Sequence, residues 1–466
     1  MKRTISIALA LCFIAALAVP VMALEIETTG GYRLRGFSYK NPTFNDEDKH
    51  SDDKYDHRLR MDHVLTIADN LKLSVRWTGF DNTWGTEVNR GYAEKGDYDT
   101  FILNRAFMTY VSPIGKFDIG RQLGGAWALP FGDYAGDFDR IKYTVPIGDK
   151  VAVIGILQKG TEGDFQTRNA NMVPYSDADA DVYYLVGNYK AEKFSTGILT
   201  AYVRNPINEA RKQNYYAAVP YFNGTFGDIT FMLEAVYEFG RFDDDRNGAI
   251  NGNDMEIGAF TFGTELNGKH GAFGWETGYG HLQGQDARRL AGNDRKWTFA
   301  NFAYGGLGQD WDKFVYLTDT SGTAILTNYC SNQGAVTVNP LAATSATMPA
   351  LGGAHIWWLG ASYMPKETLK LSVLGGAARA AEYDYNPLTG QAWQGADYGT
   401  ELDFRLSWDI TPNLNYAFNF GWLFVGDAMA DVAGADQLIA TGGAYVLDKN
   451  DLQDGCKIYH KIEVSF

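Results

Sequence analysis

The feature that most constrains the fold of this chain is a two-residue alternation of apolar and polar side chains that recurs in many short segments. In residues 414–424, one set of alternate positions holds large apolar side chains and the other holds small or polar ones such as Asn415. Residues 401–409 repeat the pattern, with Glu401 and Asp403 in the polar set. This period is that of a β-strand, whose successive side chains point to opposite faces of the sheet. The pattern predicts strands with one apolar and one polar face.

The connections between these segments fall into two length classes, which alternate along the chain. Short turns are expected at Ala68–Asn70, Ser112–Gly115, Pro146–Asp149, Lys190–Lys193, Gly224–Asp228, Pro365–Thr368 and Ile410–Asn413. Long loops are expected at Asn41–Tyr55, Asp81–Asp99, Gly160–Ala180, Arg241–Asp254, Tyr383–Tyr398 and Gly426–Gly455. This arrangement is typical of a bacterial outer-membrane β-barrel, whose apolar faces meet lipid and whose polar faces meet a wet lumen. It disfavours a soluble β-sandwich.

The first residues predict export. Lys2 and Arg3 precede an almost wholly apolar run from Ile5 to Val19, and small residues follow at the cleavage positions. We therefore expect a signal peptide over residues 1–23 and a single all-β transmembrane barrel over 24–466. No later stretch offers roughly 18 uninterrupted apolar residues, so the sequence predicts no membrane helix. The expected location is the bacterial outer membrane.

Composition and charge narrow the class of partners. Aromatic residues make up 14% of the chain, with 52 glycines and 13 prolines, which favours many short strands. Removing Lys2 and Arg3 changes the formal net charge from −15 to −17, which disfavours nucleic acid and anionic lipid as partners. Cys330 and Cys456 both fall in predicted loops, and a disulfide between them is one alternative in an oxidising compartment.

Basic residues recur on the polar faces of the first strands. They alternate with apolar or aromatic residues of the opposite face, such as Leu34, Leu59 and Val75: Arg33, Arg35, Arg58, Arg60, Lys72 and Arg76. An arginine or lysine at the lipid midplane costs about 2–4 kcal/mol, so several together on the apolar face would be prohibitive. We therefore predict that they line the lumen. The face of Arg105 stays open, because apolar residues occupy both sets of alternate positions in Phe101–Val111.

The stretch from Phe117 to Tyr143 predicts a constriction loop folded into the barrel. Glycines at 124, 125, 132 and 136 supply unusual backbone dihedrals, and carboxylates follow at Asp133, Asp137 and Asp139. We expect these carboxylates to face Arg121 and the wall arginines and to favour cations. Strict alternation from Phe117 would point Arg121 toward lipid, so we expect a bulge near Gly120 to re-aim it. The alternative is an ordinary acidic surface loop.

The last strand, Lys457–Phe466, ends on an aromatic residue. This residue and several segments of the chain resemble those of a known family. A terminal Phe resembles the aromatic by which the outer-membrane assembly machinery recognises its clients. Residues 104–107, 112–115 and 117–122 resemble the general-porin pattern of strand, short turn and strand ending in Gly-Arg. Residues 76–85 and 124–133 are similar to trimeric porins of anaerobic sulfur- and metal-reducing bacteria. The resemblance implies a homotrimer with an inward loop whose acids face wall arginines.

The long segment Ala291–Gly353 leaves the number of strands open. As one large external excursion it gives about eighteen strands, and a hidden hairpin would change the number, with sixteen as another alternative. Because the N-terminal strand pairs with the last in single-chain bacterial barrels, the count must be even.

One acidic loop has the spacing of a calcium-binding loop. Its oxygen ligands would come from Asp243, Asp245, Asn247, Ala249, Asn251 and Asp254. Gly248 occupies the sixth position, as in the twelve-residue motif. The last position is Asp rather than Glu, and strands flank the loop, so a solvated acidic loop is the alternative. Apart from this calcium ion, we expect no cofactor.

The function predicted is a passive, water-filled channel for small hydrophilic solutes and ions. No nucleophile elbow, H-E-x-x-H, P-loop or C-x-x-C-H motif is present, which argues against an enzyme. His63 and His460 fall on apolar faces and are expected at a subunit contact or the membrane interface. Three alternatives stay open: a substrate-specific channel, for example for anionic polysaccharide export; a barrel sleeve around an electron carrier; and a barrel enzyme.

Overall fold

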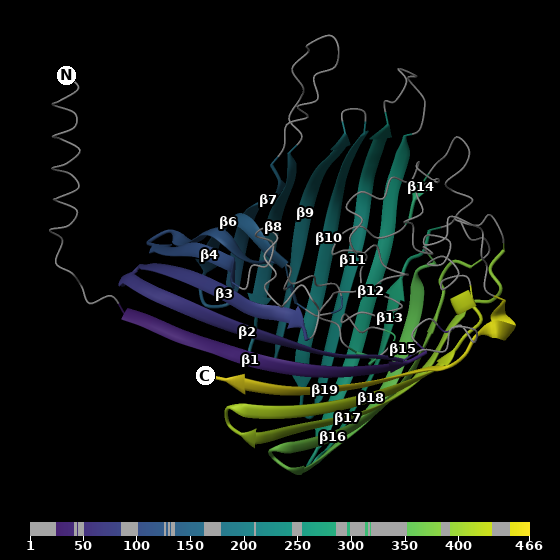
Figure 1. The fold of residues 1–466 in the computed structure, drawn as a ribbon. Helices are drawn as coiled ribbons and strands as arrows, with labels where there is room; N and C mark the ends of the chain where they lie inside the picture. Colours follow the sequence, from purple (N-terminus) through teal and green to yellow (C-terminus); the bar gives the residue numbers. More distant parts are fainter. Residues whose placement is uncertain are drawn as a thin grey trace, which may run out of the picture.

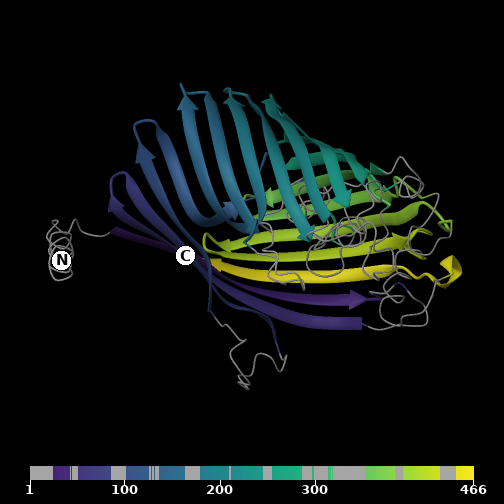
Figure 2. The same cartoon turned by 90° about the horizontal axis from the view of Figure 1, so that it is seen from above.

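The structure is a computed structural model of the chain. It describes residues 25–41, 44, 51–84, 101–124, 127–128, 131, 136–162, 179–208, 211–244, 254–285, 296–298, 313–315, 317, 352–383, 392–430 and 448–466. The predicted signal peptide lies outside these residues. The described chain is almost entirely β-structure, curved into a barrel (Figures 1 and 2).

The strands are β1 (Glu25–Lys40), β2 (Ser51–Ala68), β3 (Leu71–Thr83), β4 (Phe101–Ser112), β5 (Gly115–Gly124), β6 (Gly136–Ile147), β7 (Val151–Thr161), β8 (Ala180–Lys190), β9 (Phe194–Asn208), β10 (Arg211–Phe226), β11 (Ile229–Asp244), β12 (Met255–His270), β13 (Phe273–Leu282), β14 (Lys296–Trp297), β15 (Ala354–Lys366), β16 (Leu369–Arg379), β17 (Asp397–Thr411), β18 (Leu414–Val425) and β19 (Gly455–Ser465). A 3₁₀ helix, η6 (Lys449–Asp451), precedes β19.

Eighteen of these strands form one closed antiparallel wall. Each strand pairs with the next along the chain, and β1 pairs with β19 from Gly31 opposite Ser465 to Lys40 opposite Cys456. The purple β1 and the yellow β19 lie side by side in Figure 1. The two-residue β14 stands apart because it pairs in parallel with β12, while β13 pairs directly with β15. The eighteen-strand prediction is confirmed. Because β13 pairs directly with β15, the alternatives of sixteen strands and of an extra hairpin in the wall are wrong.

The seven predicted short turns are confirmed, since each lies at the junction of two consecutive strands. An eighth short turn, between β12 and β13, was not predicted, and Gly271 adopts a positive φ of 58° there. Several strands are longer than expected. β2 has 18 residues and begins at Ser51, inside a predicted long loop. The barrel wall therefore extends beyond the height that the strand pattern alone indicated.

The two faces of the wall lie as predicted. On β17 the side chain of Leu402 is 50% exposed on the outer face, while Glu401 and Asp403 on the inner face are fully buried. On β18 Phe424 is 51% exposed and Leu423 is buried. Inner-face residues are covered by other protein groups rather than by open water, which indicates that parts of the chain occupy the lumen.

No helix in the described part of the chain is long and apolar enough to cross a membrane. Cys456 lies in β19 rather than in the predicted loop, and it forms no disulfide with another described residue. Cys330 lies outside the described residues.

Candidate solute pathway through the barrel

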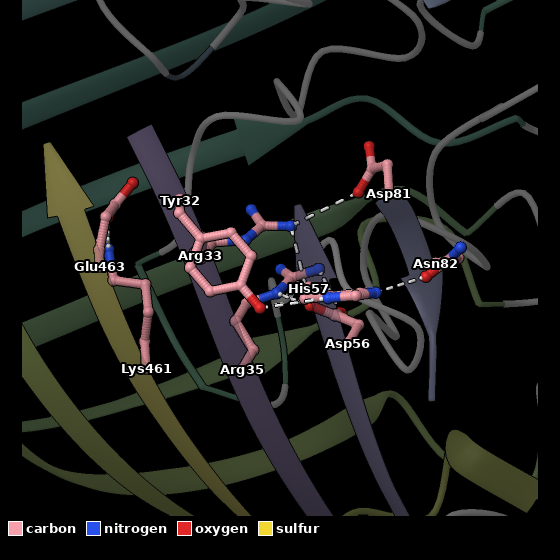
Figure 3. A network of polar contacts seen from close by, with 9 residues as sticks. All are labelled: Tyr32, Arg33, Arg35, Asp56, His57, Asp81, Asn82, Lys461 and Glu463. Carbon is pink, nitrogen blue, oxygen red and sulfur yellow. Dashed lines mark hydrogen bonds and ion pairs between the residues drawn. The ribbon is translucent and has the colours of Figure 1, made fainter. Parts of the chain in front are cut away.

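A wall of arginines lines one side of the lumen, on strands β1 to β4. Arg33 and Arg35 share the inner face of β1, and Arg58 and Arg60 share the inner face of β2. Asp56 is the principal counter-ion, because Arg35 donates to both of its carboxylate oxygens at 2.8 and 2.6 Å. Figure 3 shows this bidentate pair beside Arg33. Such a pair fixes both the position and the plane of a guanidinium.

A bulge in β3 brings a second carboxylate to this wall. The pairing of β2 with β3 steps from His57 opposite Asn82 to Leu59 opposite Gly79. Phe80 takes up the extra residue with a positive φ of 53°. Because an extra residue reverses the alternation beyond it, Asp81 turns inward and lies 3.8 Å from an Arg33 nitrogen. Sequence reasoning had placed this aspartate only at the start of a loop.

A second bulge settles the face of Arg105. Arg76 lies opposite Arg105, but the next pair is Trp77 with Leu103, so Asn104 is the additional residue. Arg105 consequently joins the inner wall, where its Nε donates to Asp137 at 2.5 Å. Arg76 in turn donates to both oxygens of Asp62, at 2.7 and 2.9 Å. Each of these two arginines thus has a partner of its own.

Arg58 and Arg60 differ from their neighbours, because neither forms an ion pair within the described residues. Arg58 lies directly opposite Arg33 across β1 and β2, an arrangement of like charges that destabilises a sheet. The Nε atoms of Arg33 and Arg60 are buried and have no hydrogen-bond partner among those residues. This part of the wall therefore carries excess positive charge.

Two described residues of the connection between β5 and β6, Trp127 and Phe131, contact the inner wall of the barrel. The indole Nε1 of Trp127 donates to the carbonyl oxygen of Val219 on β10 at 3.0 Å, and its ring contacts Tyr221 edge-on at 5.0 Å. Phe131 is buried against Gly263 on the inner face of β12, where any Cβ would collide with its ring. Trp127 and Phe131 therefore reach β10 and β12, which are far round the barrel from β5 and β6. Asp133 lies outside the described residues, while Asp137 and Asp139 belong to the wall strand β6.

The expected position of Arg121 is corrected by the strand register. Gly120 does adopt a positive φ of 123°, yet both pairings of β5 continue through it without a shift. Arg121 therefore stays on the outer face with the exposed Ile119 and Leu123. It lies 3.1 Å from Asp139, the residue directly opposite, and both side chains are about half exposed, at 48% and 62%. A glycine dihedral alone does not invert a strand, because only an inserted residue changes the phase.

A second inward segment, at Lys313–Leu317, was not predicted. The ammonium group of Lys313 lies 2.9 Å from Glu265 and 2.6 Å from Glu276, on β12 and β13. The backbone N–H of Val315 donates to Asp403 at 3.0 Å, and that of Leu317 donates to Glu401 at 2.7 Å. Four inner-wall carboxylates thus bind one segment through its side-chain charge and its main chain.

Packing reinforces this attachment. Phe314 is buried against Gly376 on β16, and Val315 lies against Gly421 on β18, where a Cβ would meet it at 2.7 Å. The Lys313 ammonium also lies 5.2 Å from the centre of the Trp358 ring. Phe131, Phe314 and Leu317 belong to one buried apolar cluster with inner-face residues such as Ile356 and Trp358. The contacts of the described inward segments are therefore with β10, β12, β13 and β16–β18, whereas the arginine wall lies on β1–β4.

The two ends of the candidate calcium loop converge on an arginine. Arg241 lies 2.7 Å from Asp243 and also pairs with Asp254, the first and last positions of the motif. Asp245, Asn247, Ala249 and Asn251 lie outside the described residues. Across the described part of the chain, no group of three or more His, Cys, Asp or Glu side chains could hold a metal ion. A calcium ion would have to compete with the Arg241 guanidinium, and the site stays a prediction.

No protein-family model matches the chain, and no curated protein matches its sequence. Solved structures do match its fold. OccK8 (OprE) of Pseudomonas aeruginosa aligns with a TM-score of 0.50 and 10% identity over 95% of this chain and 98% of its own. OccAB3 of Acinetobacter baumannii aligns with a TM-score of 0.50 and 9% identity over 94% and 99%. The outer membrane protein opdK from Pseudomonas aeruginosa aligns over similar lengths with a TM-score of 0.45.

Likeness at this identity shows the fold alone. The chain has the closed eighteen-stranded antiparallel barrel of bacterial outer-membrane porins.

Proposed function

We propose that this protein is a bacterial outer-membrane channel through which small hydrophilic solutes diffuse, and that it prefers anionic solutes. A closed barrel with an even number of strands, an apolar outer face and long loops on one side supports the membrane location. The wall arginines on the inner faces of β1–β4 support the preference. The observation that carries this proposal is the excess positive charge at Arg33, Arg58 and Arg60.

The preference for anions reverses the sign expected from the sequence. That expectation rested on three loop carboxylates facing the lumen, but Asp139 lies on the outer face and Asp137 is paired with Arg105. The acidic residues Glu265 and Glu276 are likewise occupied, by Lys313. The unpaired inner-wall charge described here is therefore positive, and a ring of positive side chains favours anions.

The test is the reversal potential of the purified channel in a planar bilayer under a potassium chloride gradient. A charge about 4 Å from an ion contributes about 1 kcal/mol in water. The double variant Arg58→Gln/Arg60→Gln should therefore lower the anion-to-cation permeability ratio several-fold. Arg121→Gln removes one positive charge from the outer face and should leave the ratio unchanged. An unaltered ratio in the double variant would show that the arginine wall does not border the pathway.

A substrate-specific channel is the second candidate, favoured by Arg58 and Arg60, which form no ion pair within the described residues. Guanidinium groups with free donors bind carboxylates bidentately, so a small organic anion is the class of substrate that would fit. Saturation of the single-channel current by one carboxylate would favour this candidate, because the current through a general pore does not saturate. An anionic polysaccharide would compete in the same assay. A sleeve for an electron carrier would instead co-purify with a haem protein.

We also propose a homotrimer, in keeping with the resemblance to trimeric porins. Polar and aromatic side chains on the outer faces of β1–β3 and β19 support a contact there, since lipid-facing positions are otherwise apolar. The pairs include Thr28 with His63 at 3.0 Å and Tyr32 with His57 at 3.2 Å, and the His460 ring lies 5.7 Å from that of Tyr55. Conductance in steps of three and a trimeric mass in native mass spectrometry would support this assembly. A monomeric mass in mild detergent would contradict it.

A further inference from the structure

We propose that His281, His355 and Tyr279 form a binding site for a divalent transition-metal ion on the outer face of the barrel. The two histidines lie directly opposite each other across β13 and β15. Tyr279 lies two residues before His281 and therefore shares its face. The exposed neighbours Phe260 and Trp357 mark this face as the outer one. The site is separate from the solute pathway.

The distance between the two imidazoles carries the proposal. Their Nδ1 atoms are 3.3 Å apart, longer than the 2.9–3.0 Å typical of an N–H···O hydrogen bond. Two nitrogens bound to one tetrahedral zinc ion at 2.0–2.1 Å lie roughly 3.3 Å apart, so the pair already has the spacing of two ligands. The Tyr279 hydroxyl lies 2.6 Å from His355 Nδ1 and offers a third donor atom. The Tyr279 hydroxyl and His281 Nδ1 thus both lie within 3.3 Å of His355 Nδ1.

The surrounding rings hold this geometry in place. The His281 and His355 rings stack at 4.8 Å with an interplanar angle of 29°. Phe262 lies 5.8 Å from His281 and 5.5 Å from Tyr279, and Phe260 lies 6.4 Å from His281. Ligands whose rotamers are fixed by packing bind a metal with less loss of entropy. The site is therefore preorganised.

The position of the pair allows a metal ion to reach it from water. His281 is the penultimate residue of β13 and His355 the second residue of β15, at the end of the barrel that carries the long loops. Aromatic side chains such as these gather at the membrane–water interface of outer-membrane barrels. Imidazole suits zinc, copper and nickel, whereas calcium and magnesium prefer oxygen ligands. The site should therefore discriminate between these two groups of ions.

Arg379 is the one described cation close to the site. It lies opposite His355 across β15 and β16, and its guanidinium lies 3.8 Å from Asp397 and 5.4 Å from the centre of the Tyr383 ring. Its positive charge opposes a bound cation. Removing that charge with Arg379→Gln should strengthen metal binding by a few-fold, whereas a site that did not bind a cation would not respond.

The experiment is isothermal titration of tag-free, folded protein in detergent with zinc chloride, in the presence of excess calcium. The parent should bind one zinc ion in a step that calcium does not remove. Either His281→Gln or His355→Gln should weaken this step by more than the roughly 10–100-fold that loss of an outer-shell partner causes. His63→Gln is the matched control, since His63 is an outer-face histidine whose described partner is Thr28.

Copper provides a readout that does not depend on affinity. Electron paramagnetic resonance of the copper-loaded parent should show two equivalent nitrogen ligands, and His355→Gln should show fewer. All of these variants change surface side chains, so heat-modifiable migration on a gel checks that each barrel is folded. Equal zinc binding by the parent, His281→Gln and His355→Gln would overturn the proposal, as would a parent that binds no zinc.

Discussion

At the scale of the residue, the charge balance of the arginine wall depends on the orientation of single side chains. Arg33 and Arg58 face each other across two strands, and Asp81 reduces their repulsion because the bulge at Phe80 turns it inward. Asp139, by contrast, compensates Arg121 on the outer face. Two aspartates of the same formal charge therefore have different effects on the lumen, according to the face on which they lie.

These two aspartates give a matched pair of variants. Asp81→Asn should raise the anion-to-cation permeability ratio, because it uncovers the Arg33 guanidinium, and Asp139→Asn should leave the ratio unchanged. Partly exposed ion pairs contribute about 0.2–1 kcal/mol, so neither barrel should lose more than this in free energy of unfolding. Reversal potentials and urea unfolding of the two variants check both expectations. An equal change in reversal potential would mean that total charge, and not position, sets the selectivity.

At the scale of the element, the segment Lys313–Leu317 narrows the lumen by docking on an acidic patch of the inner wall. Its attachment combines the ion pairs of Lys313 with two main-chain hydrogen bonds to buried carboxylates. Arg405 adds a hydrogen bond to the Lys313 carbonyl at 2.5 Å. Carboxylates buried in this way need their partners, because an unpaired buried charge is costly.

Lys313→Gln should therefore loosen this segment. Hydrogen bonds to charged groups contribute about 1.5–3 kcal/mol each, so losing the ammonium should shift the segment away from the wall for a larger fraction of the time. We expect a larger and noisier single-channel conductance. Lys366→Gln, in the exposed end of β15, is the control with the same change of charge. In a double-mutant cycle, adding Glu276→Gln to Lys313→Gln should change the single-channel conductance little further. Additive effects would show that the two residues do not act together.

At the scale of the whole molecule, closure of the wall does not depend on the long excursion between β13 and β15. Leu282 lies directly opposite Ala354, so the two strands form a hairpin whatever lies between them. The final residue takes part in closure, since Phe466 exchanges backbone hydrogen bonds with Gly30 at 2.7 and 3.0 Å. The barrel is thus a continuous hydrogen-bonded ring with inward segments added to it.

Replacing residues 283–353 by Asn-Gly, the preferred sequence of a two-residue hairpin turn, should leave a folded barrel of higher conductance. Loss of Phe314 and Leu317 exposes part of the apolar cluster, at a cost of about 25 cal/mol per Å², so thermal stability should fall. Heat-modifiable gel migration, circular dichroism and bilayer recording check the three expectations. Failure to form any barrel would show that the excursion is needed for closure.

Much of this architecture could be predicted because it is encoded locally. Alternation along β11, β17 and β18 identified the outer and inner faces, and turn residues located the hairpins, since strand period and turn chemistry depend only on near neighbours in the chain. The same argument assigned Arg33, Arg35, Arg58, Arg60 and Arg76 to the inner wall. The low tolerance of lipid for charge made that assignment firm.

The sequence by itself thus determined the barrel, its two faces and its basic wall. Tertiary structure decided which charges are paired and where the lumen is filled. Bulges at Phe80 and Asn104 turned Asp81 and Arg105 inward, and an unbroken register kept Arg121 outside. Lys313 met Glu265 and Glu276, and His281 met His355, only because the closed sheet brings them together. A local pattern fixes the phase of a strand, but an inserted residue reverses it, and contacts between distant segments exist only once the barrel has closed.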